Sequence, residues 1–327
     1  MKAIVYHQYG SPDDVLQFAD MDKPAINDNE VLVRVRAASV NPADWHLVRG
    51  KPYIARLQLG LRKPKDTVLG CDVAGQVEAV GKNVTTFQPG DEVFGSPFGH
   101  GCGALAEYVR LSDALLAPKP ANLSFAQAAA VPLAAVTALQ GLRDQGGIEP
   151  GHKVLIIGAS GGVGTFAVQI AKAFGAEVTG VCSTRNIDLV RSIGADHVID
   201  YTQEDLTQSE QRYDLIFQLA GTRSPSDCRR ALTAQGTLVL ASGESDGHWI
   251  GPVARIIRAL LLSPFVSQKM ASFTVKPNSK DLRTLKELIE AGKVTPVIDR
   301  THSLTEVPEA IRYLEEGHTQ GKVVITV

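Results

Sequence analysis

Residues 153 to 182 constrain the fold more than any other part of this chain of 327 residues. The run KVLII at 153–157 is apolar and β-branched without alternation, as in a parallel strand buried on both faces. Gly158, Gly161 and Gly164 follow at three-residue spacing, an apolar helical pattern continues to Gly175, and EVTGVC resembles a second strand. This order predicts a strand, a glycine-rich turn, a helix and a second parallel strand.

The three glycines suit a turn that brings the backbone against a pyrophosphate and then starts a helix packed tightly on the strand. The N–H groups and the dipole at the start of that helix would face the phosphates. A tight turn without a ligand is the alternative. The strands and the helix at the proper distances favour a dinucleotide-binding unit.

The composition is that of a globular protein long enough for two domains, with 44% hydrophobic residues. A net charge of −2 gives no reason to expect nucleic acid or an anionic membrane as a partner. The four cysteines show no CxxC spacing and fit reduced thiols better than disulfides. Because no signal peptide or spanning helix is evident, we expect a cytoplasmic protein without a transmembrane segment.

Two patterns of secondary structure divide the chain. Up to about residue 124, short strand candidates separated by Gly and Pro suit a small barrel; they lie at 3–6, 30–38, 72–80, 92–94 and 105–109. Strands and helices then alternate, as in a doubly wound parallel sheet. Its expected strands are KVLII, EVTGVC, HVIDY, DLIFQLA and TLVLAS, with a sixth around Phe273.

The connecting helices also have recognisable ends. Ser124 is a plausible N-cap of a lead-in helix that Pro132 would break. Two later helices are expected at 279–291 and 307–316, each followed by glycine. The last strand, KVVITV, is expected to return to the first domain, with the ligand cleft between the domains at the carboxyl ends of the strands.

The end of the second strand indicates which nicotinamide cofactor is preferred. NAD-selective sheets carry an Asp or Glu there for the ribose 2′-hydroxyl, whereas this chain has Cys182, Ser183, Thr184 and Arg185. Ser183 and Arg185 could donate hydrogen bonds to a 2′-phosphate, which predicts NADPH. The alternative is that Arg185 is a solvated surface side chain.

A catalytic zinc needs about three converging Cys, His or carboxylate ligands. His100 and Cys102 lie close together in a glycine-rich loop, but no ligand pair at zinc spacing occurs in the sequence. We therefore expect no metal site.

The run GHKVLIIGASGGVGTFAVQIAK at 151–172 resembles the quinone oxidoreductase and zeta-crystallin family, the zinc-free branch of the medium-chain dehydrogenases/reductases. The resemblance extends to SVNPADW at 39–45, LGCDVAGQVEAVG at 69–81, PGDEVFG at 89–95, GALAEYV at 103–109 and GKVVITV at 321–327. It implies an α/β protein with a GroES-like β-barrel catalytic domain, 1–124 and 278–327, and a Rossmann NADP-binding domain, 125–277. It also implies a homodimer, by analogy with such proteins.

The same resemblance implies roles for individual residues. Zinc-bearing relatives place a Cys at Asn41, a His-Glu pair at Cys71-Asp72 and another Cys near Leu133, so the metal ligands are absent here. Asn41, Asp44 and Thr137 match positions at the nicotinamide and substrate end, and they are expected to be catalytic together with His46. His46 stands where relatives often have tyrosine, so His46, Tyr53 or water is the expected proton source. The alternatives are a structural His46 and a turn-capping Asp44.

Tyr201 and Lys322 match cofactor contacts of NADPH-binding relatives, although Tyr201 could simply cap its strand and Lys322 could be a surface charge. The full set of expected cofactor-binding residues is Gly158, Ser160, Gly161, Gly162, Val163, Gly164, Ser183, Arg185, Tyr201, Gly221, Ser242 and Lys322.

The substrate pocket is expected to be apolar, with Trp45, Tyr53 and Trp249 in its wall. The apolar segment 249–266 is interpreted as a helix over the substrate cleft or a subunit interface, with contact to a membrane surface as the alternative.

Without zinc to polarise a carbonyl, a conjugated acceptor is favoured because it spreads the developing charge onto its own oxygen. The predicted activity is hydride transfer from NADPH to a quinone or an α,β-unsaturated carbonyl (an enone). The alternatives are a zinc-free NADP-dependent alcohol dehydrogenase, a peripheral membrane reductase and a non-enzymatic NADPH-binding protein.

Overall fold

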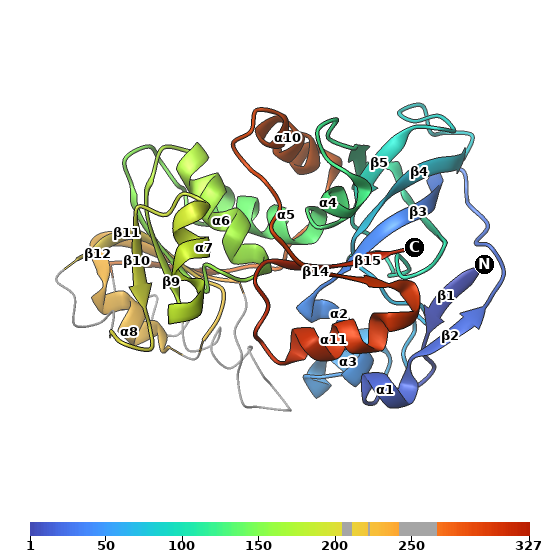
Figure 1. The fold of residues 1–327 in the computed structure, drawn as a ribbon, viewed down its shortest axis with the longest axis horizontal. Coiled ribbons are helices and arrows are strands. Elements are labelled where there is room, and N and C mark those ends of the chain that lie inside the picture. The colour runs from blue at the N-terminus through green and yellow to red at the C-terminus, as the bar shows by residue number, and fades with distance from the viewer. Residues whose placement is uncertain (205–210, 222, 242–266) are drawn as a thin grey trace. The chain divides into compact units, whose positions relative to one another are not determined.

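The computed structural model describes residues 1–204, 211–221, 223–241 and 267–327 (Figure 1). The chain divides into two compact units, which are described one at a time. The first unit contains Met1–Val136, Lys276–Gly292 and Pro296–Val327, and the second contains Thr137–Val275 and Lys293–Thr295. Ser242, Trp249 and the segment 249–266 fall outside the described residues, and so do the predictions made for them.

Six parallel strands form the sheet of the second unit, in the order β10-β9-β8-β11-β12-β13. Their bounds are β8 Lys153–Ile157, β9 Glu177–Cys182, β10 His197–Asp200, β11 Tyr213–Gln218, β12 Leu232–Leu240 and β13 Lys269–Ser272. Counted along the chain the order is 3-2-1-4-5-6, that of a Rossmann sheet, which confirms the predicted doubly wound architecture. The sixth strand ends before Phe273, because the chain leaves the sheet to rejoin the first unit at Lys276.

The helices of this unit pack on neighbouring strands (Figure 1). Helix α6 (Gly162–Ala173) covers β8 and β9, α7 (Ile187–Ser192) covers β9 and β10, and α8 (Pro225–Arg230) packs on β12. A short 3₁₀ turn, Thr184–Asn186, precedes α7. Gly175 follows α6 with φ +82°, so the predicted glycine stop is confirmed.

The lead-in helices follow the predicted pattern. Helix α4 (Phe125–Ala129) starts where the Ser124 hydroxyl accepts the Gln127 N–H, and α5 (Pro132–Gln140) begins at the proline that was expected to break the helix. A π-helical turn, Gly141–Gln145, extends α5.

Strand β3 (Glu30–Val40) is the centre of the seven-stranded sheet in the first unit. It pairs with β4 (Val73–Val80), β6 (Tyr108–Ser112) and β15 (Lys322–Thr326), all antiparallel. The sheet is completed by β5 (Glu92–Gly95), β7 (Leu116–Pro118) and β14 (Ile298–Ser303), and β1 (Lys2–Val5) pairs separately with β2 (Gln17–Asp20). Since β15 joins β3, the predicted return of the final strand to the first domain is confirmed.

From Val33 to Arg36 the side chains of β3 alternate between buried and exposed, whereas Leu32 is also buried. Val31, Val33 and Val35 are buried, whereas Arg34 and Arg36 are exposed. The strand expected at 105–109 lies instead at 108–112, because Leu105 and Ala106 make bridging contacts to Leu69 and Ala3.

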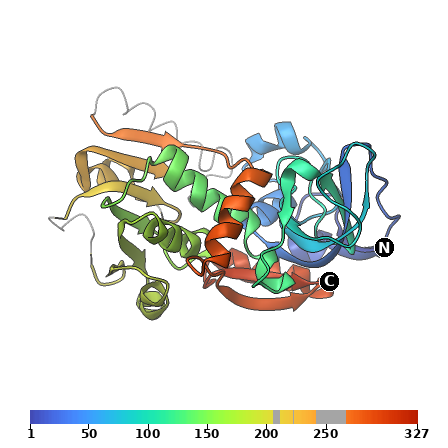
Figure 2. The ribbon, with the colours of Figure 1, turned by 90° about the horizontal axis from the view of Figure 1, so that it is seen from above.

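Helix α4 belongs to the first unit and packs on β3 and β4, and further helices of this unit follow. They are α1 (Pro12–Val15), α2 (Pro42–Arg49), α3 (Arg56–Leu59), α10 (Ser279–Glu290) and α11 (Val307–Glu315), with 3₁₀ turns at Tyr53–Ala55, Asp113–Leu115 and Leu304–Glu306. The predicted glycine stops follow α10 and α11, with positive φ at Gly292 and Gly317. Figure 2 shows β14 and β15 side by side near the end marked C. Within the described ranges, no helix is long and apolar enough to cross a membrane.

Candidate active site

The turn between β8 and α6 shows why its glycines are needed. Gly158 has φ +89°, a conformation that L side chains rarely adopt. A Cβ on Gly164 would lie 2.0 Å from the Gly158 carbonyl oxygen, so the helix can approach the turn only without a side chain there. A Cβ on Gly161 would meet its nearest heavy atom, the same oxygen, at 3.6 Å. The backbone at Gly161 therefore borders space that a side chain or a phosphate would fill.

Gly162 and Val163 form the first turn of α6, whose N-cap is Gly161 without a side-chain cap. The first N–H groups of a helix have no partner within the helix and attract anions. Binding of a pyrophosphate at this turn stays a prediction. Gly221 lies three residues after the end of β11 and has φ +78°. A Cβ at this position would have no heavy atom within 4 Å.

Asn186 connects two of the predicted cofactor residues, and the sequence analysis missed it. Its Nδ2 donates to the Ser160 hydroxyl at 2.9 Å and to the Ser183 hydroxyl at 3.3 Å, while the residue is 5% exposed. The glycine turn and the end of β9 are therefore held together by one buried amide. The signal that could have identified it is an Asn at the start of a helix beside the second strand.

The end of β9 carries the residues expected to select the cofactor. Ser183 is half-buried, and Arg185 and Tyr201 are exposed. Asp200 ends β10 in register with Cys182, and its carboxylate accepts from the Thr184 and Thr202 hydroxyls. The Thr184 hydrogen bond, followed by those from Thr202, lowers the pKa of Asp200. A charged carboxylate therefore lies at the same edge of the sheet as the end of β9, which leads to Ser183 and Arg185.

The first unit contains a buried polar cluster, defined as Ser39, Asn41, Asp44, Asp72 and Lys322. None of the five is more than 4% exposed. Lys322 Nζ donates to Asn41 Oδ1 at 2.5 Å and to the Val40 carbonyl at 3.2 Å, and it lies 3.3 Å from Asp72 Oδ2. The alternative of Lys322 as a surface charge is wrong. The ammonium group binds three protein acceptors, and its predicted contact with the cofactor stays a prediction.

Asp72 is the main acceptor of the buried polar cluster. It accepts from the Ser39 hydroxyl at 2.7 Å, from Asn41 Nδ2 at 2.8 Å and from the Leu133 N–H at 2.7 Å. Asn41, Asp72 and Leu133 stand at or near positions where the resemblance places zinc ligands in zinc-bearing relatives. Here hydrogen bonds join these positions, and the Lys322 ammonium supplies the positive charge. Among the described residues, no three His, Cys, Asp or Glu side chains are grouped so that they could hold a metal ion.

Asp44 caps α2 from inside the cluster. Its carboxylate accepts from the Asn41 N–H at 2.8 Å, from the Gly70 N–H at 3.2 Å and from the Cys71 thiol at 3.6 Å. Burial raises the pKa of Asp44 to about 6, while the Asn41 hydrogen bond opposes the shift. The turn-capping role is therefore present, and a role beside the nicotinamide ribose stays a prediction.

His46 has a tautomer fixed by its surroundings. Nδ1 lies 2.9 Å from the Lys51 carbonyl oxygen, which can only accept, so Nδ1 carries the proton. Burial lowers the pKa of His46, so the imidazole is neutral at pH 7 with Nε2 unprotonated. The ring stacks on Trp45 with centroids 3.6 Å apart. These contacts favour the structural role of His46 over that of proton donor.

The remaining predicted residues lie in different surroundings. Trp45 is half-buried against the core of the first unit, and Tyr53 stands in a 3₁₀ turn with the Arg56 guanidinium 4.8 Å from its ring centre. Thr137 is half-buried on α5 in the second unit. The pocket roles of Trp45 and Tyr53 and the catalytic role of Thr137 stay predictions.

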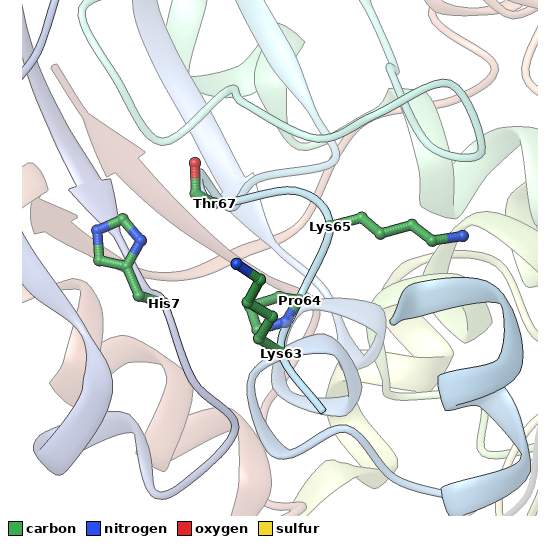
Figure 3. Close-up of a pocket in the computed structure, with 5 residues that line it drawn as sticks. All are labelled: His7, Lys63, Pro64, Lys65 and Thr67. Atoms are coloured by element: carbon green, nitrogen blue, oxygen red, sulfur yellow. The ribbon is translucent and has the colours of Figure 1, made fainter. Parts of the chain in front are cut away.

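A cavity of about 400 Å³ opens in the first unit, lined by His7, Lys63, Pro64, Lys65 and Thr67 (Figure 3). Figure 3 shows the Lys65 side chain extending away from the other four. None of these residues belongs to the predicted site, so the cavity gives no support to the predicted chemistry.

Comparisons with known proteins match both parts of the chain. Residues 27–121 match the alcohol dehydrogenase GroES-like domain, and residues 193–325 match the family described as zinc-binding dehydrogenase. The chain is 36% identical to the chloroplastic NADPH-dependent alkenal/one oxidoreductase of Arabidopsis thaliana, over 99% of this chain and 79% of that protein.

Solved structures give the same result at the level of the fold. The quinone oxidoreductase of Coxiella burnetii has a TM-score of 0.87 and 32% identity, over 100% of this chain and 99% of that one. The Escherichia coli quinone oxidoreductase complexed with NADPH has a TM-score of 0.86 and 26% identity, over the whole of both chains. With a GroES-like domain, a Rossmann sheet and relatives matched over nearly the whole length, the chain belongs to the quinone oxidoreductase family, the zinc-free branch of the medium-chain dehydrogenases/reductases.

Proposed function

We propose that this protein is an NADPH-dependent reductase that transfers hydride to quinones or enones. The observation that carries the proposal is the glycine turn before α6, where Gly164 lets the helix pack closely and Gly161 borders open space. Relatives over nearly the full length are named an NADPH-dependent alkenal/one oxidoreductase and a quinone oxidoreductase. Both names describe reduction of conjugated carbonyl compounds.

The residues of the glycine turn and the first turn of α6 would hold the pyrophosphate of the cofactor. Ser183 and Arg185 would bind its 2′-phosphate, with Arg185 balancing the nearby Asp200 carboxylate. When bound, NADPH supplies a hydride from C4 of its nicotinamide ring. Asn186 keeps the two serines, Ser160 and Ser183, at fixed positions relative to each other.

We propose a positioning role for the buried polar cluster. Both ends of the Asn41 amide are engaged, Oδ1 with Lys322 and Nδ2 with Asp72. We therefore propose that Asn41 positions the chain around α2 and leaves stabilisation of the enolate oxygen to backbone N–H groups. With Nδ1–H of His46 bound to Lys51, water or Tyr53 is the proposed proton source.

We keep three further expectations as proposals. The catalytic domain comprises residues 1–124 and 278–327 and the NADP-binding domain 125–277, the protein is cytoplasmic, and it forms a homodimer. Light scattering coupled to size exclusion would test the dimer by giving a mass of about twice 35.0 kDa.

The activity is tested by following NADPH oxidation with 1,4-benzoquinone, 9,10-phenanthrenequinone, an alkyl enone and a saturated aldehyde. We expect turnover with the quinones or the enone, unchanged by a chelator. Oxidation of an alcohol with NADP but no reduction of the panel would support a dehydrogenase instead. NADPH binding without turnover of any acceptor would support a non-enzymatic role.

Cofactor choice has its own test in Arg185→Ala. Loss of the guanidinium should raise KM for NADPH about 10- to 100-fold and leave KM for NADH nearly unchanged, because only NADPH carries the 2′-phosphate. Arg191→Ala, on the adjoining helix α7, is the matched control and should change neither value. Equal effects of Arg185→Ala on both cofactors would contradict the assignment.

A further inference from the structure

Cys71 and Cys102 are 31 residues apart in the sequence and adjacent in the first unit. Their Sγ atoms are 3.3 Å apart, and both residues are free thiols. A disulfide needs an S–S separation of about 2.05 Å, so a shift of little more than about 1 Å joins them. The spacing of the four cysteines in the sequence gives no sign of this contact.

The backbone holds the two segments in place. Both Gly103 N–H and Ala104 N–H donate to the Gly70 carbonyl, at 3.1 and 3.2 Å, and Leu105 N–H donates to the Leu69 carbonyl at 2.9 Å. Residues next to Cys71 are thus hydrogen-bonded to residues next to Cys102. These hydrogen bonds keep the two cysteines beside each other.

Glycines flank Cys102 on both sides, with φ +93° at Gly101 and +151° at Gly103. A glycine-flanked residue can adjust its backbone at low energetic cost. The loop at Cys102 can therefore supply the small shift, while Cys71 stays fixed next to β4.

The two thiols differ in their access to solvent. Cys71 is fully buried, and the hydrogen bond to Cys102, followed by burial, raises its pKa well above the ordinary value. Cys102 is only half-buried. A small oxidant therefore reaches Cys102 first, and Cys71 is placed to react with the oxidised sulfur.

We propose that Cys71 and Cys102 are a modification site that forms a reversible disulfide in response to hydroperoxides. In the first step the Cys102 thiolate attacks the peroxide, an S–O bond forms, the O–O bond breaks, and an alkoxide or hydroxide leaves. In the second step Cys71 attacks the Cys102 sulfenic acid, the S–S bond forms, the S–O bond breaks, and water leaves. Two electrons pass from the thiols to the peroxide, and a dithiol reductant reverses the change.

Asp44 connects this site with the buried polar cluster. Its Oδ1 lies 3.6 Å from Cys71 Sγ, in position to accept the thiol proton in the second step. Formation of the disulfide removes the S–H donor from that carboxylate. The oxidation state of the pair therefore changes the hydrogen bonds in the first turn of α2.

The other two cysteines provide an internal control. Cys182 and Cys228 belong to the second unit, both are buried, and burial raises the pKa of Cys182 to about 11. Cys228 donates to Gln218 Oε1 at 3.7 Å. Neither has the access that Cys102 has, so both should stay reduced.

The test treats the reduced, folded protein with hydrogen peroxide at a few molar equivalents, removes the peroxide and counts thiols in denaturant. We expect the count to fall from four to two and to return to four with dithiothreitol. Peptide mass spectrometry should find the peptides of Cys71 and Cys102 joined, with the loss of two hydrogens. The Cys182→Ser/Cys228→Ser double variant retains the pair and should fall from two thiols to none.

Dimedone, which traps sulfenic acids, tests the order of the steps. In Cys71→Ser we expect the label on Cys102, and in Cys102→Ser we expect no label on Cys71. Four thiols persisting after peroxide, loss confined to Cys182 or Cys228, or a disulfide only between two chains would overturn the proposal. If a single variant fails to fold, the thiol count of the double variant decides alone.

Discussion

The buried polar cluster contains charged side chains whose removal should affect the stability of the fold. Lys322 and Asp72 form an ion pair whose side chains are 4% and 0% exposed. Such a pair adds little net stability when it is intact, because both charges have lost their hydration. Removal of one partner is costly, because it leaves the other charge buried and unpaired.

Lys322→Met should therefore lower the free energy of unfolding by about 3–5 kcal/mol, as expected for breaking a buried ion pair. The measurement is urea unfolding at pH 7. Lys82→Met is the control, because Lys82 pairs with Asp28 at side-chain exposures of 73% and 54%. It should change the free energy by less than about 1 kcal/mol. Equal effects of the two substitutions would show that the cluster does not hold Lys322 as described.

Asp44 should make stability depend on pH. Its pKa is about 6 in the folded protein against an ordinary value of 3.8, so the folded state favours the protonated form. The contribution of Asp44 to stability is fully present below pH 3.8 and is lost as the pH rises through about 6. At 1.36 kcal/mol per pKa unit, the loss is about 3 kcal/mol.

Asp44→Asn should remove this fall between about pH 4 and about pH 6. Urea unfolding of both proteins at several pH values measures it, with the exposed Asp28→Asn as the matched carboxylate control. The prediction fails if Asp44→Asn keeps the pH slope of the parent protein.

The sequence predicted the segment from β8 through α6 to β9 best, because both strands and the helix lie where they were expected. Local patterns decide such a unit, because buried parallel strands and a glycine turn each leave their own signal. The buried polar cluster could not be predicted from such local patterns. Lys322 reaches it only because β15 pairs with β3, and Cys102 reaches Cys71 only through a loop contact.

Substitutions at two glycines of the turn between β8 and α6 distinguish an effect on stability from an effect on cofactor binding. Gly164→Ala places a Cβ 2.0 Å from the Gly158 oxygen, so α6 must shift and we expect a loss of stability of about 1–3 kcal/mol together with weaker NADPH binding. Gly161→Ala has its nearest contact at 3.6 Å and an ordinary negative φ, so stability should change by less than about 1 kcal/mol.

NADPH affinity is the informative measurement for Gly161→Ala. If the backbone there approaches the pyrophosphate, the added methyl group should raise Kd for NADPH at least about tenfold, or about 1.4 kcal/mol. Titration calorimetry gives Kd, and thermal unfolding gives stability. A stable Gly161→Ala protein with unchanged NADPH affinity would contradict binding of the pyrophosphate at this turn.

For the whole molecule, the barrel-like first unit and the Rossmann sheet of the second place this chain among the quinone oxidoreductases. The fold does not determine the acceptor, because the same architecture serves several oxidoreductions. The choice of a quinone or an enone as acceptor depends on two arguments. The resemblance implies that this chain lacks the zinc ligands of zinc-bearing relatives, and relatives are named for the reduction of such compounds. The acceptor must therefore be identified by chemistry.

The most direct test of the proposed activity follows a labelled hydride. The protein is incubated with NADPH deuterated at C4, as each stereoisomer in turn, and an alkyl enone, and the product is analysed by mass spectrometry and NMR. The account predicts one deuterium on the β-carbon of a saturated ketone, from one of the two stereoisomers only. Deuterium on the carbonyl carbon of an allylic alcohol, or a reduced product without deuterium from both stereoisomers, would contradict it.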